Sequence, residues 1–112
     1  MFYFNDSDHL SNATIGQDDL FDLLEQMLPL SAKWKAIGVG LRLPLDGLEA
    51  IEFGYGSPME CMTGVLTLWL RMKYNVERFG LPSWRMVLNV VAHPAAGDNP
   101  DLALEIAKKT PR

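Results

Sequence analysis

Apolar residues recur along most of this chain at the spacing of an amphipathic helix. A stripe that is buried on one helix face needs apolar side chains at positions i, i+3, i+4, i+7 and i+8. The first run with this pattern consists of Leu20, Leu23, Leu24, Met27 and Leu28. Pro29 follows directly and should end the helix, because proline lacks the backbone donor that a helix interior needs.

Two short helices are expected next. Ser31 is placed to cap the second helix, and Gly38 would let a neighbouring element approach it closely. The inward-facing residues of this helix are Trp34, Ile37 and Leu41. Asp46, with Glu49 three positions later, forms a variant capping box that opens the third helix. The third helix is broken by the sequence FGYGS and buries Leu48 and Ile51.

The strongest start signal in the sequence opens a fourth helix. Ser57 can act as the cap, Pro58 occupies the first helical position and Glu60 completes a capping box. The apolar stripe of this helix consists of Met62, Val65, Leu66 and Trp69, widened by Leu68 and Leu70. An apolar surface of this width predicts that the fourth helix lies centrally in the fold.

Two more helices complete the pattern. Ser83 is placed to cap the fifth helix directly after the sequence GLP, and Pro94 and Gly97 close it. Its stripe consists of Trp84, Val87, Leu88 and Val91. Asn99 and Pro100 repeat the cap-then-proline start. The last helix buries Leu102, Ala103, Ile106 and Ala107.

Six helices joined by short turns predict an all-α fold, an antiparallel six-helix bundle. The 112 residues, 48% of them apolar, fit one domain with a single core. Apart from FYF at residues 2–4, no segment alternates as a strand would. The side chains expected to anchor the core are Trp34, Ile37, Leu66, Trp69, Trp84 and Leu88.

The composition argues against several classes of function. Cys61 is the only cysteine, so no internal disulfide can form, and no cluster of Cys and His has the spacing of a zinc site. No window supplies the roughly eighteen apolar residues of a membrane span, and the N-terminus lacks the features of a signal peptide. We therefore expect a cytoplasmic protein with no cofactor, no metal and no small-molecule ligand.

Catalysis and nucleic-acid binding are the rival functions. Cys61 and His93 are the only conceivable nucleophile and base among the residues expected to be ordered, but Cys61 falls within an apolar helix pattern and His93 at a helix end. We therefore expect no enzymatic activity. Short basic stretches, a net charge of −4 and a pI near 5.0 disfavour binding to the phosphates of nucleic acid.

Charge is segregated along the chain. The acidic blocks include Asp19, Asp22, Glu25, Asp46, Glu49 and Glu52. The basic blocks contain Lys33, Lys35, Arg42, Arg71, Lys73, Arg78 and Arg85. Two interpretations are open for these blocks, an ordinary solvated surface or docking patches of opposite sign. Tyr74 and Phe79, in the corner before the fifth helix, can either anchor a partner or cover the edge of the core.

The six segments together resemble a death domain of the death-fold superfamily. The resemblance covers about residues 18–109 and rests on the order and spacing of WKAIGVGL, LEAI, PMECMTGVLTLWL, PSWRMVLNVV and NPDLALEIAKK. The residues that match the family pattern are Trp34, Glu60, Trp69, Leu70, Ser83 and Trp84. The sequences RMKYNVERFG and HPAAGDNP make two connections longer than in many members. The chain then divides into an N-terminal extension (residues 1–17), a death domain (18–110) and a tail (111–112).

The resemblance implies a Greek-key order of the helices and a function without catalysis. Death domains assemble signalling complexes in apoptosis or innate immunity by binding other death domains, of the same or a different protein. Patches of unlike charge would give such contacts a physical basis, with the basic second helix meeting the acidic first or third helix of a neighbour in a homo-oligomer. A domain that docks permanently on one partner without polymerising is the alternative, and a small nucleic-acid-binding domain is a weaker one.

Overall fold

The computed structural model describes residues 14–109, and every regular element in this range is helical. The α-helices are α1 (Leu20–Met27), α2 (Trp34–Gly40), α3 (Leu45–Gly54), α4 (Pro58–Leu70), α5 (Trp84–Ala92) and α6 (Pro100–Lys109). The 3₁₀ segments are η2 (Gln17–Asp19), η3 (Leu28–Lys33) and η4 (Lys73–Phe79). The prediction of an all-α fold with six helices is confirmed for this range, and the FYF sequence at residues 2–4 lies outside it.

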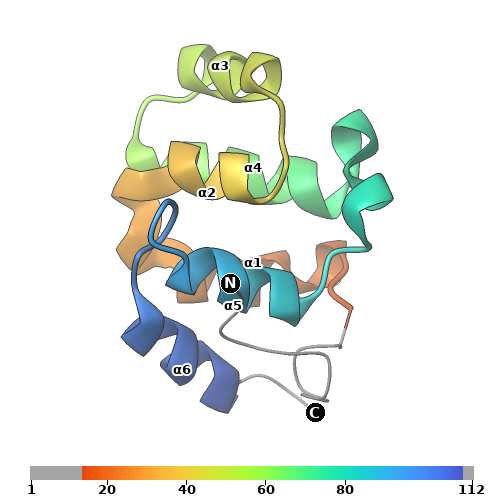
Figure 1. Cartoon of the computed structure of the whole chain (residues 1–112). Helices are drawn as coiled ribbons and strands as arrows, with labels where there is room; N and C mark the ends of the chain where they lie inside the picture. Colours follow the sequence, from red (N-terminus) through yellow and green to blue (C-terminus); the bar gives the residue numbers. More distant parts are fainter. Residues whose placement is uncertain (1–13, 110–112) are drawn as a thin grey trace.

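The helix α4 occupies the centre of the fold (Figure 1). It contacts α1, α2 and α3, and also η3 and η4. One side of the layer formed by α2 and α4 is covered by α3, and α1 and α5 lie on its other side. The last helix, α6, packs against α5. The predicted central position of the fourth helix is therefore confirmed.

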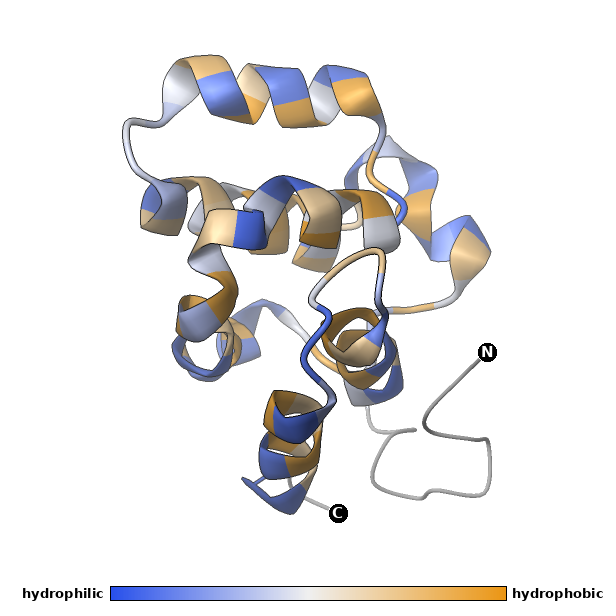
Figure 2. Cartoon of the chain, turned by 60° about the vertical axis from the view of Figure 1, so that its left-hand side comes forward, coloured by the Kyte–Doolittle hydropathy of each residue, from blue (hydrophilic) through white to orange (hydrophobic). Residues whose placement is uncertain are grey.

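The sequence of α4 explains this position. Its fully buried side chains are Met62, Val65, Leu66 and Trp69. Cys61, Gly64 and Leu70 extend the buried surface around the helix. A helix with so wide an apolar surface needs neighbours on several sides. The other helices supply them and complete one core with Leu23, Ile37, Leu48, Leu88 and Ile106. Along the outer helices α3 and α6, by contrast, hydrophilic and hydrophobic residues alternate (Figure 2).

Three of the predicted helix caps are confirmed by hydrogen bonds. The Oγ atoms of Ser57 and Ser83 each accept a bond from the backbone N–H three residues later, at 3.2 and 3.3 Å. The Oδ1 atom of Asn99 does the same at 3.0 Å. Each bond satisfies an amide group that the start of a helix leaves without a partner, and such a cap contributes about 1 kcal/mol.

Two other predicted caps were wrong. Ser31 lies inside η3, and its hydroxyl donates a hydrogen bond of 2.8 Å to the carbonyl of Leu28. The 3₁₀ turn delays the start of α2, which has no side-chain cap. Asp46 is also no cap, because α3 already begins at Leu45 after the extended residue Pro44. Asp46 lies instead in the first turn, where the helix dipole favours a carboxylate.

The three tryptophans differ in burial. Trp69 is 0% exposed and Trp84 is 7% exposed. Trp34 is only half-buried and packs against the edge of the core. Trp34 therefore contributes to the edge of the core and not to its centre, as the first residue of α2. The other predicted anchors, Ile37, Leu66 and Leu88, are fully buried.

The packed domain begins before residue 18. Ile15 is 5% exposed and belongs to the core, and its backbone N–H donates a hydrogen bond of 2.9 Å to the carbonyl of Pro82. Thr14 and Ser83 form an isolated antiparallel bridge. Residues 14–17 therefore belong to the domain, since an apolar side chain of this segment is buried next to the start of α5.

Backbone contacts close the turn between α5 and α6. The N–H of Gly97 donates a hydrogen bond of 3.0 Å to the carbonyl of Val90. A Cβ atom at position 97 would lie 2.8 Å from the Cα of Val91 and 2.9 Å from its carbonyl carbon. Contacts this short force the backbone to move, so glycine is the residue that fits this turn.

We expect Gly97→Ala to lower the free energy of unfolding by about 2 kcal/mol, because the added methyl group overpacks the turn against backbone atoms. Gly54→Ala is the matched control, since nothing lies within 4 Å of a Cβ there and alanine favours a helix by up to about 1 kcal/mol. Urea unfolding followed by circular dichroism measures both variants. Equal stabilities would show that the turn accepts a Cβ.

Candidate functional site

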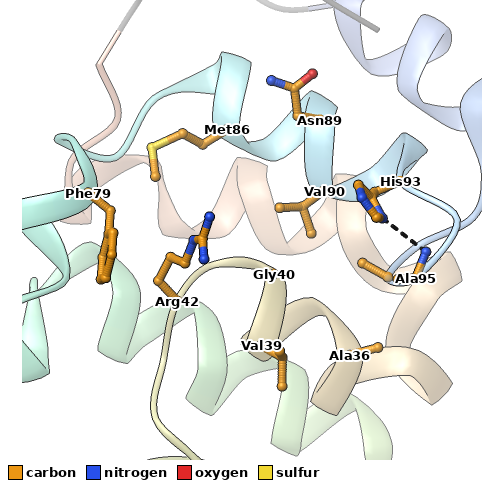
Figure 3. Close-up of a pocket in the computed structure, with 11 residues that line it drawn as sticks. Ala36, Val39, Gly40, Arg42, Phe79, Met86, Asn89, Val90, His93 and Ala95 are labelled. Atoms are coloured by element: carbon orange, nitrogen blue, oxygen red, sulfur yellow. Dashed lines mark hydrogen bonds between the residues drawn. The ribbon is translucent and has the colours of Figure 1, made fainter. Parts of the chain in front are cut away.

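A groove lies between α2, α5 and η4 (Figure 3). Its volume of about 540 Å³ falls in the range of sites that bind ligands. Its walls are mostly apolar and include Ala36, Val39, Met86, Val90 and Ala96. The polar and aromatic lining comes from Arg42, Phe79, Asn89 and His93, and no described residue that lines it carries a carboxylate. We call this cavity the α2–α5 groove.

Arg42 and Phe79 form the η4 end of the groove, and Arg78 lies beside them over the same aromatic ring. The guanidinium carbon of Arg42 lies 5.3 Å from the ring centre of Phe79, and that of Arg78 lies 4.8 Å from it. A phenyl face attracts a cation at these distances. All three residues are exposed, so both charges can meet a partner. We call Arg42, Arg78 and Phe79 the arginine–phenylalanine corner.

The end of α2 directs Arg42 into this corner. The backbone of Arg42 has a left-handed conformation, with a φ of 73°. The N–H of Arg42 donates to the carbonyl of Val39, and the N–H of Leu43 donates to that of Gly38, both at 3.0 Å. These two bonds form a Schellman motif, in which glycine is usual at the left-handed position. Leu43 is buried, so the chain turns inward while the arginine side chain stays at the surface.

The turn after α5 forms the opposite end of the groove. The Nδ1 atom of His93 accepts a hydrogen bond of 3.0 Å from the backbone N–H of Ala95, drawn as a dashed line in Figure 3. In a neutral imidazole whose Nδ1 accepts, Nε2 carries the proton. The exposed ring of His93 therefore offers a donor at this end.

The basic residues near α2 do not form one continuous patch. The Nζ atom of Lys33 donates a hydrogen bond of 2.9 Å to the carbonyl of Gly97. The Nζ atom of Lys35 forms a 3.2 Å salt bridge with Oε1 of Glu52 on α3. Arg42 lies at the other end of α2, in the arginine–phenylalanine corner. Lys35 and Glu52, predicted to meet oppositely charged neighbours, are thus partners within one molecule, because α2 and α3 pack side by side.

The helix α3 packs by one face only. Its buried residues are Gly47, Leu48 and Ile51. Its exposed residues include Asp46, Glu49 and Phe53, whose i, i+3, i+7 spacing places them along one side of the helix. The side chain of Phe53 is 93% exposed. We call Asp46, Glu49 and Phe53 the α3 stripe, an apolar ring beside two carboxylates.

Sequence reasoning missed Phe53. The sequence FGYGS indicated the end of the third helix, whereas α3 continues to Gly54. A usable signal was present, because Phe53 follows Glu49 by four residues and therefore shares its side of the helix.

The acidic residues near α1 lie apart from this stripe. Asp22 and Glu25 are exposed on α1, next to Phe21, which is 74% exposed. Asp19 is half-buried, and its Oδ2 atom accepts a hydrogen bond of 2.9 Å from the backbone N–H of Gly16. Asp19 therefore stabilises the chain before α1 and is the least accessible of these carboxylates.

The remaining basic residues are spread over two elements. Arg71 and Lys73 are exposed where α4 passes into η4, whereas Arg85 is half-buried on α5. Tyr74 and Phe79 are 49% and 47% exposed. Phe79 lines the groove, and the ring of Tyr74 lies against α3 at Gly47. Tyr74 therefore covers an edge of the fold, and a partner contact by either residue stays a prediction.

Cys61, the candidate nucleophile if the protein were an enzyme, is buried. Cys61 is 5% exposed in α4. Burial, followed by the negative charges of Glu52 and Glu60, raises the pKa of its thiol above the ordinary value of 9.0. A thiol that keeps its proton at neutral pH is a weak nucleophile. These surroundings favour a packing role for Cys61.

Comparison of the chain with protein-family models, with curated proteins and with solved structures found no match. Within residues 14–109, no group of three or more His, Cys, Asp or Glu side chains is placed to hold a metal ion. No helix in that part of the chain is long and apolar enough to cross a bilayer. The surface features of the described residues that bear on function are the α2–α5 groove, the arginine–phenylalanine corner and the α3 stripe.

We expect the stability of the protein to fall as the pH rises above 9.0, the ordinary pKa of the thiol. Above this pH the unfolded chain loses the Cys61 proton first, so the folded state binds more protons and becomes less favoured. The loss is at most about 1.4 kcal/mol per pH unit. Urea unfolding at pH 8 to 10 should give a steeper pH dependence for the natural sequence than for Cys61→Ala. Parallel curves would show that the thiol does not contribute.

Proposed function

We propose that this chain is a death-domain-like interaction module with the Greek-key helix order of that family. In this proposal it assembles signalling complexes by binding other death domains, including copies of itself, through charged surface patches. The order of the six helices, their capping residues and the central fourth helix support the family assignment. An all-α module of this kind acts by contact, and no chemistry on a substrate is part of the proposal.

The observation that carries the proposal is the separation of charge between the α3 stripe and the arginine–phenylalanine corner. Asp46 and Glu49 are exposed on a helix that contains no lysine or arginine. Arg42 and Arg78 are exposed on the corner formed by the end of α2 and by η4. Surfaces of unlike charge at different places on one molecule favour contact between copies.

Magnitudes determine how such an assembly must work. One exposed ion pair contributes about 0 to 1 kcal/mol, whereas even millimolar binding needs about 4 kcal/mol. The entropy of association opposes binding further. A single charged contact is therefore weak. Stable complexes need several contacting surfaces, an apolar contribution, or clustering of modules that are linked to one another.

We expect light scattering to report a weight-average mass that rises with protein concentration at low salt. The mass should return toward the 12.6 kDa of one chain as salt is added, because the screening length falls from about 30 Å at 0.01 M to about 8 Å at 0.15 M. A mass of one chain under all these conditions would contradict self-assembly. A complex that saturates with one partner and stops growing would support the non-polymerising alternative.

Charge reversal tests whether the corner is responsible. Arg42→Glu with Arg78→Glu should keep the protein monomeric at low salt while leaving its helical circular dichroism unchanged. Lys108→Glu with Lys109→Glu is the matched control, since it changes the net charge equally at exposed positions of α6 and should leave assembly intact. Equal effects of the two double variants would show that only net charge matters, against a specific patch.

A further inference from the structure

We infer that two copies of this chain dock by inserting Phe53 of one copy into the α2–α5 groove of the next. The inference rests on the proposed function and names the surfaces by which self-assembly proceeds. It assigns an apolar core to the contact, with Glu49 of the first copy placed against the arginines of the second. The occupant of the groove is thus a second copy of the chain.

The α3 stripe has the form of a docking element. Phe53 is 93% exposed, so the described part of the chain leaves almost the whole ring uncovered. Glu49 lies one turn before it on the same side of α3. Aromatic side chains that become buried in a pocket are the common anchors of protein interfaces, and surrounding polar residues then exclude water from them.

The α2–α5 groove has the size and chemistry to receive this element. A cavity of about 150 Å³ already accepts benzene, and the groove has about 540 Å³. Its volume therefore leaves room for the phenyl ring and for parts of the adjacent helical turn. Val39 and Met86 on its two sides provide apolar contacts for a ring (Figure 3).

The charges of the two surfaces are complementary. The groove ends at Arg42 and Phe79, and Arg78 lies over the same ring just beyond its lining. No carboxylate belongs to the described lining. The helix that presents Phe53 carries carboxylates and no basic residue. A neutral apolar peptide would use the walls of the groove but leave both arginines without a counter-charge. Complementary potential therefore favours the stripe of a second copy over an uncharged occupant.

The positions of the two surfaces determine the form of the assembly. The helix α3 lies on one side of the α2 and α4 layer, whereas α5, which forms a wall of the groove, lies on the other (Figure 1). Each copy can then use its stripe on one neighbour and its groove on another. A contact between two different surfaces does not close on itself in a dimer, and it generates rings or helical stacks.

A complementation experiment tests this contact. Phe53→Asp removes the docking element, and Val39→Glu places a carboxylate in the groove; both positions are exposed, at 93% and 51%. Each variant alone should self-associate at least about tenfold more weakly than the natural sequence, because an anchor residue carries a large share of the affinity. In an equimolar mixture, the Val39→Glu variant still has an intact stripe and the Phe53→Asp variant still has an intact groove. These two surfaces can pair once, so the mixture should form dimers of twice the chain mass but nothing larger.

Leu104→Asp, on the exposed side of α6 at 54% exposure, is the matched control and should assemble like the natural sequence. Circular dichroism and urea unfolding verify that all variants are folded. The inference is wrong if Phe53→Asp and Val39→Glu weaken assembly no more than Leu104→Asp does. It is equally wrong if the mixture associates no better than the two single variants do by themselves. That result would be expected if two copies met through a symmetric contact between their α3 helices.

Self-assembly by charge and docking through Phe53 can be tested separately. If Arg42→Glu with Arg78→Glu abolishes assembly but Phe53→Asp does not, charge-mediated assembly stands and this docking mode is wrong. If the natural sequence remains monomeric at low salt, the mode is wrong together with self-assembly. Sedimentation velocity over the same concentration series distinguishes these results, because it resolves monomers, dimers and larger species.

Discussion

Burial of the apolar surface of α4 determines where the other helices can lie. Trp69 shows which physical effect dominates there. Its Nε1 atom is buried without a hydrogen-bond partner among the described residues, which costs about 1 to 3 kcal/mol. Burying about 150 to 250 Å² of aromatic surface contributes about 4 to 6 kcal/mol. The apolar gain exceeds the polar cost, so the ring stays inside and the neighbouring helices surround it.

Two close approaches to glycine determine how α3 is attached to this body. A Cβ at Gly38 would lie 2.5 Å from Cδ2 of Leu48, and one at Gly47 would lie 2.9 Å from Cε2 of Tyr74. Without side chains at these positions, α3 can approach α2 and η4 through a narrow inner face. Its remaining sides stay exposed to solvent. The same packing that brings Lys35 to Glu52 at 3.2 Å therefore leaves Glu49 and Phe53 outside.

The proposed assembly combines a weak long-range interaction with a short-range one. Exposed charges act over the screening length and orient two molecules, but their pairs contribute little net affinity. Apolar contact acts only at short range, and the free energy that it contributes to binding is proportional to the apolar area removed from water. The arginine–phenylalanine corner joins both kinds of interaction at one end of the α2–α5 groove. Added salt would then screen the charged contribution and weaken the assembly, while leaving the apolar contact itself largely unchanged.

The sequence by itself determined the helices, most of their starts and the central place of α4, because periodicity and caps act over a few neighbouring residues. It failed at Ser31 and Asp46, where the 3₁₀ turn and Pro44 changed the local start. It placed Cys61 inside and showed that the charges come in blocks. Only the tertiary structure decided that Lys35 pairs with Glu52, that Arg42 and Arg78 share the ring of Phe79, and that Phe53 stands outside. These relations join residues from different helices, and their distances depend on how the helices pack around α4.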